Sequence, residues 1–412
     1  MSRKNFILII LAVIILVIGG LIFFYFTSNS NNTAQTTQTT TNPFGYAPGN
    51  KTYTNTQTTQ NNQGNNTTQN LAKLIQLYKN PTSGSVFFSN RNNKNTLRFI
   101  DRATGNLYEY LPESQTGQVQ RITNTTVPKI QEAIWSNTGD NVVLRYLDNN
   151  TDNIVSFSAK TKNVSTSTSL GEITGLFLTP NTRQMVINPI GNKIFGFVDK
   201  SDKSGIYGFT TNLDGSGKKI IIDSPISYWN ISWPKENTVT LTTKPNYKNV
   251  GLLYFLNPQT SSMDRILGNI VGLSTLTNKD ASLVAYSYSL TNSFSLGVYD
   301  VINKINKNLN VSTLADKCVW GNVNSGVLYC AVPKFIPTGD YPDVWYQGLM
   351  ALSDNVWKID TDTGSITEIY QIGTNESVDI DAFDLKISLD DKYLAFSDKN
   401  DLSLWLLSIN QK

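Results

Sequence analysis

The sequence predicts an all-β domain, a seven-bladed β-propeller, that follows one transmembrane helix and a polar linker. From about residue 71 onward, short apolar segments alternate with turn residues, and a hairpin unit recurs at intervals near ~43 residues, the length of a four-stranded blade. An uninterrupted apolar run near the N-terminus predicts the transmembrane helix. Of the 412 residues, 39% are hydrophobic and 16% are charged, so the chain can bury a sizeable core.

The N-terminal segment has the features of a signal-anchor. Residues 6–26 contain no charged side chain and are long enough to cross a hydrocarbon core of ~30 Å. Arg3 and Lys4 precede this run and no basic residue follows before Lys51, so residues 1–5 are expected in the cytoplasm and the remainder outside. A cleavable signal peptide is the alternative, but the run is long and no small-residue cleavage motif ends it. The predicted location is the cytoplasmic membrane, with a single pass.

Residues 27–70 predict a disordered linker. They consist almost entirely of Asn, Thr, Gln, Ser and Gly, with Lys51 as the only charged residue. Such a composition buries too little apolar surface to offset the entropy lost on ordering. A flexible chain of this length has a root-mean-square reach of about 35–40 Å, enough to hold residues 71–412 away from the membrane.

The repeated unit is an apolar segment that ends in a bulky pivot residue, followed by a polar turn and a second apolar segment. The pivots are Trp135, Leu178, Trp233, Leu276, Trp320 and Ile387. A further unit at residues 85–126 brings the predicted number of blades to seven. The last unit, from residue 381, contains three strands, and residues 74–78 are expected to supply the fourth and to close the ring. An eight-bladed ring, or a sandwich followed by a smaller domain, is the alternative.

The unit at Trp135–Gly139 keeps a full Trp-Ser-x-x-Gly pattern. On this pattern, residues 71–412 resemble WD-repeat-like and TolB-like propellers, although the Gly-His and Trp-Asp dipeptides of WD repeats are absent. The resemblance implies architecture and carries no activity.

Composition excludes several classes of function. The net charge is +3, and Arg3, Lys4 and Lys51 account for all of it, so the domain is neutral and nucleic acid is not an expected partner. The chain contains no histidine, which excludes His-dependent triads and His-ligated zinc. The Asp360–Gly364 segment begins like a calcium loop, but Gln371 stands where that loop needs glutamate, so a turn is predicted. No metal site and no cofactor is expected.

The two cysteines, Cys318 and Cys330, lie in successive predicted strands. A hairpin centred on Asn324 places them opposite each other, where Cβ atoms are ~4.5–5.5 Å apart and a disulfide can close after local adjustment. The oxidising side of a membrane favours that bond. Two buried free thiols are the alternative.

Two units contain extra sequence, at Asn188–Ser204 in the third and at Pro333–Asp354 in the sixth. Long loops on a rigid scaffold often carry function. The second loop combines aromatic side chains with carboxylates, which suits protein or sugar recognition. The candidate binding residues are Asp340, Tyr341, Asp343, Trp345 and Tyr346. In the alternative interpretation, this loop folds over the ring and its aromatic side chains plug the channel or pack on a neighbouring blade.

The leading functional hypothesis is a membrane-anchored, extracytoplasmic module that binds an envelope protein or a glycan and is not an enzyme. A propeller glycoside hydrolase is the second hypothesis; it requires paired carboxylates, for which Asp340, Asp343 and Asp354 are the candidates. A structural subunit of an envelope assembly, such as an export or pilus machine, is the third.

Overall fold

The computed structural model describes residues 73–409, except 115–116, 125, 149–152, 162–169, 172 and 375–377. The predicted cytoplasmic segment, transmembrane helix and linker therefore lie outside the described residues. In the part of the chain that is described, no helix combines the length and apolar character needed to cross a membrane.

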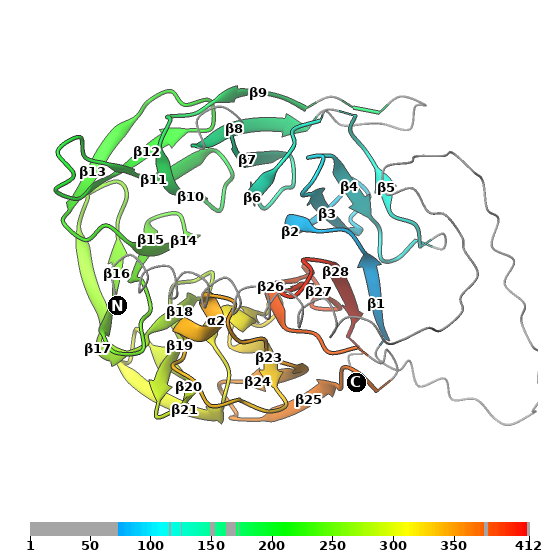
Figure 1. The fold of residues 1–412 in the computed structure, drawn as a ribbon, viewed down its shortest axis with the longest axis vertical. Helices are drawn as coiled ribbons and strands as arrows, with labels where there is room; N and C mark the ends of the chain where they lie inside the picture. The colour runs from blue at the N-terminus through cyan, green and yellow to red at the C-terminus, as the bar shows by residue number, and fades with distance from the viewer. Residues whose placement is uncertain are drawn as a thin grey trace, which may run out of the picture. The chain divides into compact units, whose positions relative to one another are not determined.

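The described residues form seven antiparallel sheets of four strands each (Figure 1). The first three blades comprise β2 (Thr82–Ser89), β3 (Asn95–Asp101), β4 (Leu107–Tyr110) and β5 (Gln120–Arg121); β6 (Ile130–Trp135), β7 (Asn141–Leu147), β8 (Ile154–Thr161) and β9 (Ile173–Phe177); and β10 (Thr182–Ile187), β11 (Lys193–Asp199), β12 (Ile206–Asn212) and β13 (Lys219–Ser224).

The fourth and fifth blades comprise β14 (Trp229–Lys235), β15 (Thr238–Thr243), β16 (Val250–Leu256) and β17 (Met263–Val271), then β18 (Ser274–Thr277), β19 (Leu283–Leu290), β20 (Ser293–Asp300) and β21 (Ile305–Val311). The sixth comprises β22 (Cys318–Trp320), β23 (Val327–Pro333), β24 (Asp354–Asp360) and β25 (Ile366–Tyr370). The seventh combines β1 (Lys73–Tyr78) with β26 (Ala382–Ile387), β27 (Tyr393–Asp398) and β28 (Leu404–Ser408). The short helices are η1 (Ala315–Lys317) and α2 (Asp343–Tyr346).

The ring is closed by the two ends of the described chain. β1 pairs antiparallel with β28, so that Lys73 faces Ser408 and Tyr78 faces Leu404. The innermost strand of the first blade, β2, contacts β6 on one side and β26 on the other (Figure 1). The predicted closure by residues 74–78 is thus confirmed, and the ring has seven blades. The eight-bladed and sandwich alternatives are wrong, because every sheet has four strands and the sheets meet in one circle.

The apolar segments form strands that are buried on both faces by the neighbouring blades. All seven residues of β3 are buried, whereas the outermost strand β21 is largely exposed. The buried middle strands also contain polar residues: Arg98 of β3 is buried and pairs with Glu109. Two pivot tryptophans join adjacent blades: Trp135 Nε1 donates to the carbonyl of Gly84 and Trp320 Nε1 to that of Leu276.

The third blade begins one strand later in the chain than the sequence pattern predicts. Leu178 follows β9, the outermost strand of the second blade, and the hairpin that opens the third blade joins β10 to β11. The prediction of an enlarged loop at Asn188–Ser204 is therefore wrong, because this segment consists of β11 and the turns on either side of it. The reason is that β9 is apolar although it is an edge strand, with Phe177 66% exposed, so that it resembles the first strand of a blade.

Candidate functional site

The predicted excursion Pro333–Asp354 is a connection between the second and third strands of blade six, β23 and β24. Connections of this kind lie at the same end of a propeller as the crossovers between blades. In the view of Figure 1, α2 of this loop lies between β18 and β23.

The loop is attached to two other blades. The Asp343 carboxylate accepts hydrogen bonds from Asn246 Nδ2 at 2.8 Å and from the backbone N–H of Tyr247 at 2.7 Å, both in the β15–β16 connection of blade four. Ser289, on β19 of blade five, donates its hydroxyl to the carbonyl of Tyr341 at 2.6 Å. The loop of blade six therefore reaches across blade five to blade four and is held at each contact.

Two of the candidate aromatic residues pack internally. Tyr341 is 1% exposed, its ring meets Phe294 edge-on with centroids 4.8 Å apart, and its hydroxyl donates to the carbonyl of Pro337. Trp345 is 3% exposed and lies between two ammonium groups, with Lys317 Nζ and Lys399 Nζ at 5.2 Å and 5.1 Å from its ring. For these two side chains the structure matches the alternative interpretation, in which the loop packs on neighbouring blades.

Tyr346 and Asp316 form a polar edge beside the buried tryptophan. The Tyr346 hydroxyl donates to Asp316 Oδ2 at 2.7 Å. Burial, and then the Asp316 carboxylate, raise the pKa of Tyr346 well above its ordinary value, so the phenol stays a hydrogen-bond donor at neutral pH. Asp340, in contrast, is exposed.

A cavity of about 720 Å³ occupies the centre of the ring, among the innermost strands and the edge of the blade-six loop. Trp345, Tyr346 and Asp316 line it together with residues of β2, β6, β10 and β26. Six charged side chains also line the cavity: Arg102, Glu132, Asp316, Asp384, Lys386 and Lys399. A second cavity of about 420 Å³ shares Glu132, Asp316 and Tyr346 with it. The central cavity is therefore lined by charged groups of both signs, whereas the charged groups of the second cavity are the carboxylates of Glu132 and Asp316.

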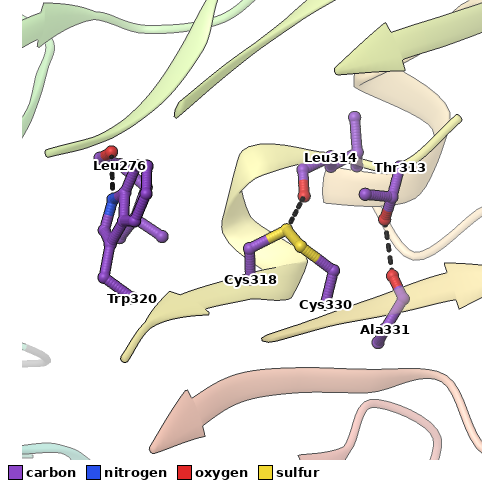
Figure 2. Close-up of a disulfide and its surroundings, with 7 residues drawn as sticks. All are labelled: Leu276, Thr313, Leu314, Cys318, Trp320, Cys330 and Ala331. Carbon is purple, nitrogen blue, oxygen red and sulfur yellow. Dashed lines mark hydrogen bonds between the residues drawn. A yellow bond between two sulfur atoms is a disulfide. The ribbon is translucent and has the colours of Figure 1, made fainter. Parts of the chain in front are cut away.

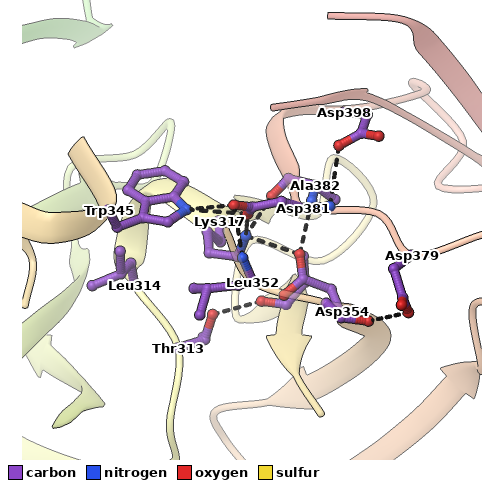
Figure 3. A network of polar contacts seen from close by, with 12 residues as sticks. Thr313, Leu314, Lys317, Trp345, Leu352, Asp354, Asp379, Asp381, Ala382 and Asp398 are labelled. Carbon is purple, nitrogen blue, oxygen red and sulfur yellow. Dashed lines mark hydrogen bonds and ion pairs between the residues drawn. The ribbon is translucent and has the colours of Figure 1, made fainter. Parts of the chain in front are cut away.

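Beneath the loop lies a fully buried ionic cluster (Figure 3). Lys317 Nζ contacts Asp354 Oδ2 at 2.8 Å, contacts Asp381 Oδ1, and donates to the carbonyl of Ala382 at 2.9 Å. Lys317 and Asp354 have no exposed side-chain surface. Trp345 Nε1 donates to the Asp381 carboxylate, so the cluster also holds the loop in place.

The expected disulfide is confirmed. Cys318 on β22 and Cys330 on β23 face each other in register and are bonded (Figure 2). Both are buried, so the bond lies within the apolar core that blades five and six share. Cys318 directly follows Lys317, and the disulfide therefore stiffens the strand next to the ionic cluster.

The three carboxylates suggested for a hydrolase do not share a site. Asp340 is exposed, Asp343 is bonded to the connection of blade four, and Asp354 is buried against Lys317. Among the residues that the structure describes, no group of three or more His, Cys, Asp or Glu side chains could hold a metal ion.

Sequence reasoning missed the residues that surround the loop, chiefly Asp316, Lys317 and Asp381. The available signal was the pair of charges in the short crossover that precedes Cys318, directly after Leu314 and Ala315. Charged residues so placed are rarely buried unless they are paired, but the sequence does not name the partner, which lies 64 residues away.

No family model and no curated sequence matches this chain. Among solved structures, an oligogalacturonate lyase in complex with manganese matches with a TM-score of 0.53 and 12% identity, over 82% of this chain and 91% of that one. An oligogalacturonate lyase from Vibrio parahaemolyticus matches with a TM-score of 0.56 and 10% identity, over 84% and 95%. TolB from Acinetobacter baumannii matches with a TM-score of 0.41 and 11% identity, over 64% and 59%.

At these identities the matches show the fold alone. The two lyase matches and the seven four-stranded sheets confirm the expected β-propeller fold. The lyase activity and the manganese remain properties of the proteins named.

Proposed function

We propose that this chain is a binding module that receives a polar ligand, a segment of an envelope protein or a glycan, in the central cavity beside the blade-six loop. The cavity of about 720 Å³ is the observation that carries the proposal. Ligand sites in proteins typically measure about 300–1,000 Å³ and contain a few well-placed polar groups. The Tyr346 hydroxyl, the Asp316 carboxylate and the charges on β26 are such groups.

The proposed role of the loop differs from the role expected from its composition. Tyr341 and Trp345 hold the wall of the cavity in place, and Tyr346 and Asp316 present hydrogen-bonding groups to the ligand. A wall attached to three blades loses little conformational entropy on binding, which favours affinity. The predicted anchor and linker would keep this cavity at the outer surface of the membrane and raise its effective concentration there.

The three carboxylates predicted for a hydrolase, Asp340, Asp343 and Asp354, do not support one. Both catalytic distances of glycosidases, ~5–5.5 Å and ~6.5–9.5 Å, require two carboxyl groups that face one open site. Asp354 is closed off from solvent and Asp343 is occupied by Asn246.

Site-specific photo-crosslinking in the native membrane tests the proposal. The crosslinker replaces Gln131, which is exposed and lines the central cavity, and in a matched variant it replaces Lys235, which is exposed in the first hairpin of blade four. First hairpins lie at the opposite end of a propeller from the crossovers. Adducts from position 131 alone are expected.

The other outcomes decide between the remaining hypotheses. Adducts from position 235 alone would contradict a central site and favour a structural subunit that docks through the opposite end. If neither position gives a protein adduct, the detergent-purified chain is applied to a glycan array. Glycan binding that is lost in a Lys399→Glu variant then supports the cavity, and an array without binding rejects the proposal.

A further inference from the structure

The cluster of Lys317, Asp354 and Asp381 is an unusual use of charge in a protein core. The three residues come from η1, from the start of β24 and from the crossover into blade seven, and none has exposed surface. Burying a charge costs several kcal/mol even after pairing. One ammonium faces two carboxylates, so the cluster has an excess negative charge whenever both acids are ionised.

The two carboxylates differ in their surroundings. Asp354 Oδ1 is buried without a hydrogen-bond partner, and its Oδ2 accepts from Lys317 and from the backbone N–H of Ala382. Burial raises the pKa of Asp354 to about 6, in spite of the neighbouring ammonium. Asp354 can therefore take up and return a proton near neutral pH.

Asp381 faces two N–H donors on one oxygen. Its Oδ2 accepts from the backbone N–H of Leu352 at 3.0 Å and from Trp345 Nε1 at 2.9 Å. The same indole nitrogen lies 3.1 Å from Oδ1, which also faces Lys317 Nζ (Figure 3). Two fixed donors aimed at a single carboxyl oxygen form the arrangement that stabilises the oxyanion of an acyl-transfer intermediate. The carbonyl carbon of Asp381 is thus prepared for attack by the amine that lies against it.

We propose that Lys317 and Asp381 condense into an isopeptide bond, with Asp354 as the acid–base group. Asp354 takes one proton from the Lys317 ammonium and passes it to Oδ1 of Asp381, and the neutral Nζ then attacks Cγ of the protonated carboxyl group. The negative charge develops on Oδ2, against Trp345 and Leu352. The N–Cγ bond forms and the Cγ–Oδ1 bond breaks. Asp354 then takes a second proton from Nζ and passes it to the Oδ1 hydroxyl, which leaves as one water molecule. The amide keeps the third Nζ proton, and Asp354 ends as the carboxylate that it was.

Burial favours condensation over hydrolysis. Groups held in contact react with effective molarities of about 10⁵–10⁸ M, and the site excludes the water that would reverse the reaction. The product replaces a buried ammonium and a buried carboxylate by a neutral amide, which removes a large desolvation cost. The isopeptide bond would join Lys317 to the crossover into blade seven, and the disulfide joins the next residue, Cys318, to β23.

Mass spectrometry of the full-length chain, purified in detergent and then denatured and reduced, tests this proposal. The wild type is expected to be lighter than its sequence mass by one water molecule. Proteolysis is expected to yield one branched peptide that joins Lys317 to Asp381. Lys317→Arg and Asp354→Ala are each expected to restore the full mass. The control variant is Asp379→Ala, which removes the exposed Lys334–Asp379 ion pair and should keep the deficit.

The wild-type spectrum decides the question even where a variant fails to fold. A wild type at full mass overturns the proposal and leaves an ionic cluster. A branched peptide that joins other residues also overturns it. An Asp354→Ala chain that still loses water rejects the acid–base role of Asp354. Formation of the Cys318–Cys330 disulfide, measured before reduction, shows that each variant has folded in this region.

Discussion

Blades three and six were the two units that extra sequence distinguished, and they differ in what the extra residues do. In blade three the excess is a misassigned strand, β11, with ordinary turns at its ends. In blade six it is a true loop that contacts blades four and five and covers a buried ionic cluster. A length excess in a repeat therefore indicates an insertion only when the extra segment has no strand pattern of its own.

The same comparison separates two kinds of ion pair. In blade three, Lys200 contacts Asp223, whose side chain is 59% exposed, and solvent screens the pair. In blade six, Lys317 and its two partners are fully buried, so each charge depends on the others. Blade three therefore provides matched control positions for blade six.

Removing Lys317 from the buried cluster of blade six is expected to have the largest effect. Lys317→Met leaves two buried carboxylates without a counter-ion and should lower the free energy of unfolding by about 5 kcal/mol. Lys200→Met in blade three should change it by much less. Urea unfolding followed by circular dichroism measures both, and equal losses in the two variants would contradict the contrast.

Removing the indole of the loop is expected to cost slightly less. Trp345→Ala creates a cavity and takes a donor from Asp381, for an expected loss of about 3–4 kcal/mol. Ile190→Ala, in the exposed β10–β11 turn of blade three, should be nearly neutral. The denaturation midpoints give the comparison, and a Trp345→Ala chain as stable as the wild type would show that the loop is not part of the folded core.

Opening the disulfide is expected to cost about 2–3 kcal/mol, since the closed loop is short. The double substitution Cys318→Ser with Cys330→Ser should lower the unfolding midpoint as much as reduction of the wild type does. Hydrogen exchange should increase mainly in β22 and β23, with β10 and β11 of blade three unchanged. Uniform exchange across all blades would show that the bond acts on the ring as a whole.

The smallest expected effect is on the pH dependence of stability. The folded-state pKa of Asp354 is raised to about 6, so the folded state binds the proton more tightly than the unfolded state. The wild type should therefore gain stability relative to Asp354→Asn as the pH falls from 7 to 4, by about 2 kcal/mol.

Asp202 in blade three should give the opposite sign. Hydrogen bonds from Ser204 lower the pKa of Asp202, so its contribution is present above its unfolded-state pKa and is lost as the pH falls. For each variant, Asp202→Asn and Asp354→Asn, the difference in free energy of unfolding from the wild type is plotted against pH. The two plots should slope in opposite directions. Two plots that slope in the same direction would contradict a raised pKa of Asp354 in the folded state.

The candidate site was predictable in position but only partly in composition. Loop length and aromatic content located the blade-six connection, and Tyr346 does line the cavity. Residue type alone could not show that Tyr341 and Trp345 face inward, because an aromatic side chain suits a core and a binding surface equally well. Asp316 and Lys399 reach the cavity from different crossover-end connections, and no local pattern links them.

Local sequence patterns were enough to predict the all-β fold, the seven units, the closure by the terminal strands and the hairpin that places Cys318 opposite Cys330. These features follow from the alternation of apolar segments with turns and from hairpin register, which act over a few residues. The meeting of Lys317, Asp354 and Asp381 beneath the loop is visible only in the folded ring. Those contacts depend on how neighbouring blades pack around the ring, and that packing brings together residues whose separation in the chain carries no pattern.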